Sequence, residues 1–219
     1  MKRNKIDYSR NKQKYNSYSV EIENLIPPAS KVLDVGCTTG MLAKALRKKN
    51  AEVFGIDIDS ASLKEASKYC KRVYLIDVDD LGDLDKKLKG EKFDAIALGD
   101  ILEHLKYPAV LLRHLNKYLK PNGKIIAKIP NSAFIWLRFR FFFGNFSYQK
   151  GGGLMDEDHI RFFSFNSAKQ LFLDSGYETQ QIAGSSSAIV DPKYFLVKYL
   201  AKAMPSLFAV HIVIEAKRK

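Results

Sequence analysis

Short apolar runs alternate with segments of helical periodicity over the first 130 residues of the chain. Each run ends at or near a glycine, aspartate or proline, which is typical of buried strands. The predicted strands are residues 31–35, 52–57, 72–77, 93–98 and 124–129. The predicted helices are residues 40–49, 60–69, with Ser60 as the expected N-cap, and 108–119, which a turn at 121–123 follows. This alternation predicts an α/β fold with a doubly wound, mostly parallel sheet.

The pattern changes after the fifth predicted strand. Residues 131–163 are rich in aromatic residues and glycine and lack a clean period, so we interpret them as a lid or substrate-binding insertion. Beyond them, the pattern predicts a helix at 166–175, a strand at 177–182, an amphipathic helix at 192–204 and a strand at 209–216. The two late strands are expected to close the sheet at an antiparallel edge, within a single domain of residues 1–219 that begins with a basic segment, residues 1–23.

Charge and cysteine usage narrow the classes of partner and compartment. The net charge of +12 favours anionic partners such as nucleic acid, phosphorylated substrates or a membrane surface, although basic, solvated ends that aid solubility explain it equally well. The two cysteines form no CxxC pair, which argues against a structural zinc site and suits a reducing compartment. The chain has neither the apolar core of a signal peptide at its start nor an apolar run of about 18 residues, so we expect a cytoplasmic protein without a transmembrane segment.

Acidic residues follow three consecutive predicted strands. Asp34 precedes a glycine turn that leads into a helix, and Asp57 and Asp77 end the next two strands. In doubly wound folds ligands bind beyond the carboxyl ends of the strands, so these acids are expected to surround a nucleotide-like ligand. A dinucleotide site needs G-x-G-x-x-G, but Thr38 occupies the second glycine position. The turn therefore favours a ligand without a pyrophosphate.

Three sequence segments resemble the ordered motifs of class I S-adenosylmethionine-dependent methyltransferases. They are VLDVGCTTG (32–40), GIDID (55–59) and LGDILEHL (98–105). Pro130-Asn131 and the His-Ile-Arg-Phe-Phe segment (159–163) are similar to small bacterial members often associated with surface-polysaccharide or secondary metabolism. The resemblance implies a Rossmann-like sheet of seven strands with an antiparallel C-terminal strand, and S-adenosylmethionine as the cofactor.

The resemblance also implies roles for particular residues. Asp34 and the backbone of Gly36 would hold the methionine end of the cofactor, and Asp57 would bind the ribose hydroxyls. Asp77 would accept a hydrogen bond from the adenine amine beside the amide of Val78. The other residues expected to contact the cofactor are Cys37, Gly40, Ile58 and Asp100, the last of them close to the transferred methyl group. The family's usual Gly-Cys-Gly-Thr-Gly has Thr38 at its centre here, which narrows the turn.

The candidate catalytic residues are Asp100, His104 and His159, with Glu103 beside them. One interpretation makes His104 or His159 a general base that a carboxylate orients. A second makes the group a divalent metal site, similar to those of small-RNA 2′-O-methyltransferases and ubiquinone-pathway O-methyltransferases, whose first position is generally Glu rather than Asp. A third is a purely structural pair, so the metal assignment stays open. His114 and His211 are expected to be structural.

The acceptor has several candidates at this stage. The favoured one is a hydroxyl of a small molecule, a sugar or a lipid-linked intermediate. RNA or DNA methylation is an alternative that the basic charge supports, although no recognition module is evident, and a non-catalytic cofactor-binding module is another. Aromatic residues interleaved with arginine in residues 134–148 could stack on a substrate, bind single strands, lie on a membrane or pack on the sheet. The helix at 192–204 adds peripheral membrane contact or a homodimer as options.

Overall fold

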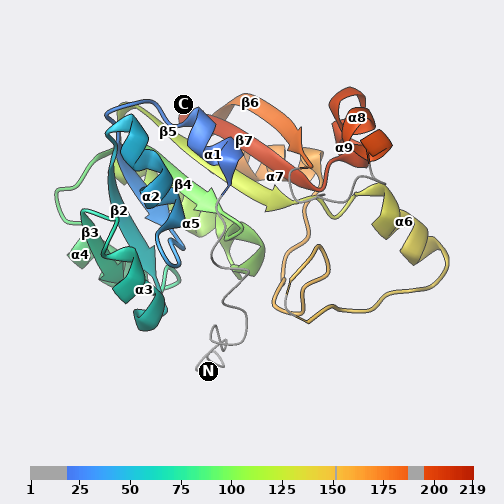
Figure 1. Ribbon diagram of the computed structural model, residues 1–219, viewed down its shortest axis with the longest axis horizontal. Helices are drawn as coiled ribbons and strands as arrows, with labels where there is room; N and C mark the ends of the chain where they lie inside the picture. The colour runs from blue at the N-terminus through green and yellow to red at the C-terminus, as the bar shows by residue number, and fades with distance from the viewer. Residues whose placement is uncertain (1–18, 151, 187–194) are drawn as a thin grey trace.

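A seven-stranded sheet organises the computed structural model, which describes residues 19–150, 152–186 and 195–219 (Figure 1). The strand order is β3-β2-β1-β4-β5-β7-β6. The strands are β1 (Lys31–Val35), β2 (Glu52–Asp57), β3 (Arg72–Leu75), β4 (Phe93–Gly99), β5 (Leu119–Pro130), β6 (Tyr177–Ser185) and β7 (His211–Arg218). β1 to β5 pair in parallel, whereas β7 is antiparallel to both β5 and β6. The predicted fold class, including the antiparallel C-terminal strand, is confirmed.

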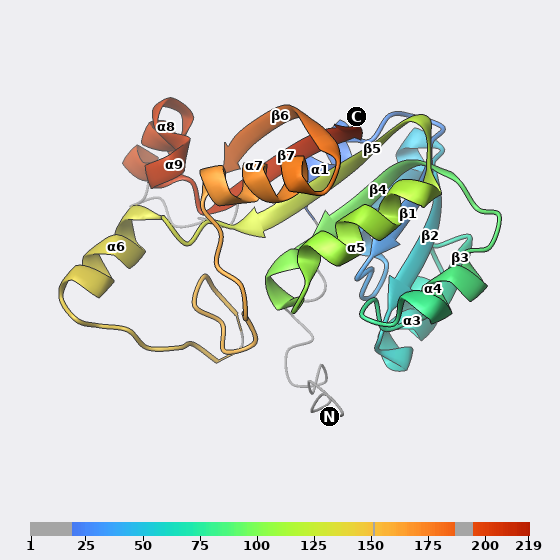
Figure 2. The same ribbon diagram turned by 180° about the vertical axis from the view of Figure 1, so that it is seen from behind.

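Helices cover both faces of the sheet (Figures 1 and 2). One face carries α1 (Val20–Leu25), α2 (Met41–Leu46) and α3 (Ser60–Ala66), and the other carries α4 (Leu81–Lys87), α5 (Pro108–Leu115) and α7 (Phe165–Asp174). Alternate strand residues supply the two cores: Val32 packs in the first and Leu33 in the second. Single turns of 3-10 helix follow α2 (η3, Arg47–Lys49), β4 (η4, Leu102–His104) and α5 (η5, Asn116–Tyr118). None of the helices in the described ranges is both long and apolar enough to cross a membrane.

The segment from residue 131 to residue 163 leaves the sheet after β5 and returns beside its starting point, because Asn131 and Phe163 form a parallel bridge. It contains α6 (Ile135–Phe142), where the sequence analysis expected no regular structure. Two further short helices, α8 (Phe195–Ala203) and α9 (Pro205–Phe208), precede β7. In both views α6, α8 and α9 lie at the end of the molecule farthest from β3 (Figures 1 and 2).

Most predicted elements agree with the structure, two details need correction, and a third prediction lies partly outside the described residues. Asp59, not Ser60, is the N-cap of α3, because its carboxylate accepts from the amides of Ala61 and Ser62. The turn expected at 121–123 lies inside β5, where the pairing with β4 shifts register. The helix expected at 192–204 is described only from Phe195, because residues 187–194 lie outside the described part, as do most of the basic residues 1–23.

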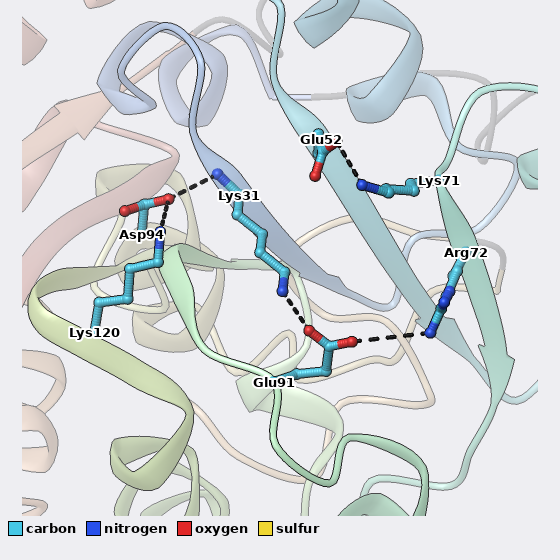
Figure 3. Close-up of polar contacts among 7 residues, drawn as sticks. All are labelled: Lys31, Glu52, Lys71, Arg72, Glu91, Asp94 and Lys120. Atoms are coloured by element: carbon cyan, nitrogen blue, oxygen red, sulfur yellow. Dashed lines mark hydrogen bonds and ion pairs between the residues drawn. The ribbon is translucent and has the colours of Figure 1, made fainter.

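Ion pairs connect the amino ends of the parallel strands, at the sheet edge opposite the predicted site (Figure 3). Glu91 pairs with Lys31 on β1 and lies 3.9 Å from Arg72 on β3. Asp94 accepts from the Lys31 amide at 2.9 Å and from the Lys120 ammonium at 2.8 Å. These groups are partly exposed, so each pair contributes at most about 1 kcal/mol to stability.

Candidate active site

A glycine turn connects the carboxyl end of β1 to α2. Gly36 and Gly40 have φ angles of 75° and 77°, a backbone conformation that residues other than glycine rarely adopt. A Cβ atom on Gly36 would lie 2.2 Å from Cδ1 of Ile101, which covers the turn from the end of β4. The turn therefore needs glycine both for its conformation and for the close approach of Ile101.

Asp57, the last residue of β2, is held in a fixed orientation by two backbone amides. The Thr38 amide donates to Oδ2 at 2.8 Å and the Asp59 amide donates to Oδ1 at 2.9 Å. Thr38 adopts a left-handed φ of 46°, which costs a β-branched residue about 1–2 kcal/mol and explains why the family pattern has glycine there. Since each carboxylate oxygen has a second lone pair, Asp57 can still accept from a diol. The sequence marks Thr38 as unusual at this position but does not reveal its orienting role.

Asp34 is a buried carboxyl group beneath the turn, with 5% of its surface exposed. Burial, and secondarily the negative charge of Asp57, raise the pKa of Asp34 to about 7. Burial also raises the pKa of Asp57, against the two amide hydrogen bonds. Two buried carboxyl groups so close to each other favour a ligand that brings a positive charge.

Cys37 fills the space that Gly55 leaves on β2. Its thiol is buried, and a hydrogen bond with Cys70 together with burial raises the pKa of the Cys37 thiol far above its usual range. Cys37 is therefore an inert packing residue of the cofactor turn. An added Cβ on Gly55 would lie 2.6 Å from the Cys37 sulfur and 3.2 Å from the Cys70 sulfur.

Gly55→Ala is therefore expected to destabilise the protein by about 1–3 kcal/mol, because the packed sulfurs leave no room for a methyl group. Chemical denaturation measures the change in the free energy of unfolding. The double variant with Cys37→Ala should recover part of the loss. Gly82→Ala in α4, whose new Cβ would have only an ordinary contact at 3.4 Å, is the matched control and should cost nothing. Equal stability of Gly55→Ala and the natural protein would contradict this packing argument.

The rim of the site comes from the carboxyl ends of β2 and β3, which are paired at Asp57 and Leu75. Ile58 presents an apolar side chain that is 39% exposed. Asp77 is exposed, and its Oδ1 accepts from the Asp79 amide at 3.0 Å. Val78 lies half-buried beside it. An apolar surface next to an acceptor suits a flat heteroaromatic ring with an exocyclic amine.

Asp100 follows β4 and adopts a left-handed φ of 53°. Its Oδ2 lies 3.3 Å from the Lys128 ammonium and its Oδ1 lies 3.9 Å from Nε2 of His211. Burial lowers the pKa of His211 to about 4, although the Asp100 charge opposes this, so the ring is neutral at pH 7. The sequence analysis missed Lys128 and treated His211 as merely structural, whereas both lie against a predicted site residue.

A second cluster combines two residues of η4, the 3-10 turn that follows Asp100, with His159 of the segment 131–163. Glu103, His104 and His159 offer carboxylate or imidazole atoms that lie within 4.8 Å of one another. The backbone carbonyl of Glu103 accepts from the amides of Ile160 and Arg161, both at 3.0 Å, which holds His159 against η4. The structure thus brings Glu103, His104 and His159 together, as predicted, and places Asp100 with Lys128 and His211 instead.

Backbone carbonyls fix the tautomers of both histidines in this cluster. Nδ1 of His104 lies 3.1 Å from the Asp158 carbonyl and Nδ1 of His159 lies 3.3 Å from the Leu154 carbonyl. A carbonyl oxygen only accepts, so each Nδ1 carries the hydrogen and each neutral ring keeps a lone pair on Nε2. Nε2 of His159 lies 3.9 Å from a carboxylate oxygen of Glu103. These three acceptors can bind a cation, either a proton taken from a substrate or a divalent metal.

Comparison with known proteins agrees with this geometry. A family described as a methyltransferase domain matches residues 8–182. Among curated proteins, the chain is 36% identical to a ubiquinone biosynthesis O-methyltransferase of Histophilus somni over 110 residues, which are 48% of this chain and 46% of that protein. It is 33% identical to the protein of the same name from Alkalilimnicola ehrlichii over 107 residues, 46% of this chain and 42% of that one. The chain thus spans about half the length of the curated relatives it matches.

Solved structures share the fold. An S-adenosylmethionine-dependent methyltransferase from Archaeoglobus fulgidus superposes with a TM-score of 0.65 at 17% identity, covering 94% of this chain and 97% of that one. The magnesium protoporphyrin IX methyltransferase of Synechocystis with bound S-adenosylhomocysteine gives 0.60 at 16% identity, with 91% and 78% covered. Since the family match covers most of the sequence, the chain belongs to the methyltransferase domain family.

Proposed function

We propose that this protein transfers the methyl group of S-adenosylmethionine to a hydroxyl of a small molecule, such as a sugar, a lipid-linked intermediate or another metabolite. The observation that carries the proposal is the cluster of Glu103, His104 and His159. It follows the carboxyl end of β4, at the edge of the sheet where β1, β2 and β3 also end. The relatives named ubiquinone biosynthesis O-methyltransferases support a hydroxyl acceptor. Residues 131–163 would form the lid over this acceptor.

The cofactor would be held by the strand ends described above. Asp34 and the Gly36 backbone would bind the methionine part, Asp57 the ribose diol, and Asp77 with the Val78 amide the adenine. The remaining proposed contacts are Cys37 and Gly40 in the turn, Ile58 against the adenine, and Asp100 near the sulfonium. The bound cofactor supplies a methyl group that is already activated for displacement.

The protein must then orient the acceptor and receive its proton. His159 is the proposed base, because its Nε2 keeps a lone pair and Glu103, 3.9 Å away, would stabilise the imidazolium. When the acceptor oxygen takes the methyl group, His159 would receive the proton that the hydroxyl gives up. His104, whose ring contacts that of His159 with centroids 4.8 Å apart, would hold the base in place.

A divalent metal is the second candidate role for the same cluster. One carboxylate and two Nε2 atoms, each histidine oriented by a backbone carbonyl, form a donor set that fits Zn²⁺, Mn²⁺ or Fe²⁺. Such an ion would polarise an acceptor hydroxyl and lower its pKa. Both roles require the same three side chains and differ in their response to chelators.

Methyl transfer from labelled cofactor tests the proposal directly. Pools of phenols, glycans, lipid extract and RNA are offered in parallel, with Asp57→Ala as the control that should lose label because its cofactor affinity falls by about 1–3 kcal/mol. We expect label in a small molecule, on oxygen by mass spectrometry. Label confined to RNA would refute the proposal. A chelator arm with metal re-addition decides between the base and the metal.

A further inference from the structure

The helix α6 and the residues that follow it expose an unusual concentration of aromatic side chains. We call this surface the aromatic tip and define it by the exposed residues Trp136, Phe139, Phe141, Phe142, Phe143, Phe146 and Tyr148. Phe142 and Phe143 are 82% and 77% exposed, and all residues from 141 to 150 are exposed. Large apolar residues gathered in this way mark an interaction surface rather than ordinary surface variation.

The aromatic tip is attached to the rest of the protein through buried residues at the start of α6. Phe134 and Leu137 are buried and attach α6 to the body of the protein. The exposed rings then pack on one another rather than on the core: the centroids of Phe142 and Phe143 lie 5.2 Å apart, and a second chain of contacts joins Phe141, Phe146 and Tyr148. Burial against the sheet, which the sequence analysis considered for these aromatic residues, therefore holds only for the base of α6.

The charged residues of the tip itself are all basic: Arg138, Arg140 and Lys150 flank the rings, and no aspartate or glutamate lies between them in the sequence. Acidic residues follow at Asp156 and Glu157, whose backbone pairs with Gln149. Arg138 donates to the Ala133 carbonyl and Arg140 to Ser147, so both guanidinium groups stay close to the tip and keep further donors. At the same end of the molecule α8 and the residue after it expose Tyr199, Lys202 and Met204 (Figures 1 and 2).

We propose that the aromatic tip inserts into the headgroup region of an anionic phospholipid bilayer. Phenylalanine rings would enter the acyl boundary, while tryptophan, tyrosine and the arginines would remain at headgroup depth. The basic residues on the tip complement anionic headgroups, each adding to the attraction. A second copy of this chain would bring the same positive charges face to face, which disfavours a dimer through this surface.

The single tryptophan gives the experiment its reporter. Trp136 is the only tryptophan of the chain, lies on the tip and is half exposed. With the full-length protein, its emission should shift to the blue on addition of phosphatidylcholine vesicles that contain phosphatidylglycerol, and brominated lipids should quench it. Vesicles of phosphatidylcholine alone should bind roughly tenfold more weakly, since the electrostatic part is lost.

Matched variants assign the binding to the tip. Phe142→Ser with Phe143→Ser should weaken vesicle binding roughly tenfold or more in a flotation assay, because both rings are exposed and carry the insertion. Val110→Ser with Leu173→Ser, which removes two exposed apolar residues from α5 and α7, should leave binding unchanged. Thermal unfolding of each variant checks that the fold is intact.

Three results would overturn the proposal. One is an emission of Trp136 that vesicles leave unchanged. Another is vesicle binding that survives the Phe142 and Phe143 substitutions, which would assign it to other basic residues of the chain. The third is a blue shift that depends on protein concentration, or on added oligonucleotide, without any lipid, which would identify a second copy or a nucleic acid as the occupant.

Discussion

Replacement of His159 by alanine is expected to lower kcat by about 10²–10⁴-fold while the affinity for S-adenosylmethionine stays within about twofold. The side chain is 6% exposed, and its Nε2 lies 3.9 Å from Glu103. Alanine therefore removes the proposed proton acceptor and leaves the carboxyl ends of β1, β2 and β3 untouched. Single-turnover methyl transfer and calorimetric titration of the cofactor measure the two quantities separately. His159→Gln, which keeps a hydrogen-bonding side chain of similar reach, checks that the loss does not come from misfolding.

His114→Ala provides the matched histidine control. Its Nε2 lies 2.7 Å from Asp85 on α4, which is remote in the fold from β4's carboxyl end, so its loss should change stability without changing kcat. Glu103→Gln then separates the two roles of the cluster. If His159 acts as a base, the Glu103→Gln protein should have a lower kcat and chelators should have no effect. If the cluster binds a metal, the Glu103→Gln protein should need a higher metal concentration for half-maximal activity. Full activity of both His159→Ala and Glu103→Gln would exclude the cluster from catalysis.

The edge of the sheet that is proposed to bind the cofactor was largely predictable from the sequence. Parallel strands such as β1 and β2 are short, apolar and buried on both faces, so their limits follow from the hydrophobic run and the glycine or aspartate after it. Because parallel strands end at one edge, Asp34, Asp57 and Asp77 had to come together there. Thr38 shows the limit of this reasoning, because only the backbone geometry reveals that its amide orients Asp57.

The acceptor side was less predictable because it depends on pairings distant in sequence. Lys128 reaches Asp100 because β5 pairs in parallel with β4, with Gly99 opposite Lys128. His211 reaches Asp100 because β7 is antiparallel to β5, with Pro130 opposite His211, so that β7 begins at the edge where β5 ends. The hydrophobic pattern within either strand does not reveal how β7 is aligned with β5. The helix α6 was missed for a related reason: its exposed face is as apolar as its buried face, so no helical period separates the two.

Asp34→Asn is expected to stabilise the free protein at pH 8 by about 2 kcal/mol and to weaken cofactor binding by roughly 30-fold or more. In the natural protein the pKa of Asp34 is raised to about 7, chiefly by burial, from a value near 3.8 in the unfolded chain. Three pKa units of differential interaction correspond to about 4 kcal/mol, and a buried amide that replaces the carboxylate costs about 1–2 kcal/mol of this gain.

The sign of the pH dependence follows from proton binding. Between about pH 4 and pH 7 the folded state holds a proton on Asp34 that the unfolded chain has released, so stability falls as pH rises through this window. Above pH 7 both states are ionised and the full penalty is present. The gain from asparagine should therefore appear at pH 8 and disappear near pH 5. Denaturant titrations at the two pH values measure it.

Cofactor binding should respond to the same ionisation in the opposite direction. The ammonium group of the methionine part attracts the charged form of Asp34, so affinity should rise with pH through about 7 in the natural protein and lose this rise in Asp34→Asn. Asp94→Asn is the matched control: its carboxylate accepts from Lys31 and Lys120 at the opposite edge, so the same change of charge should lower stability and spare binding. The contrary result would be an Asp34→Asn protein whose stability, relative to the natural chain, is lower at pH 8 than at pH 5. It would show that Asp34 has a favourable partner in the free protein. Cofactor binding would then not relieve a cost of burying the Asp34 charge.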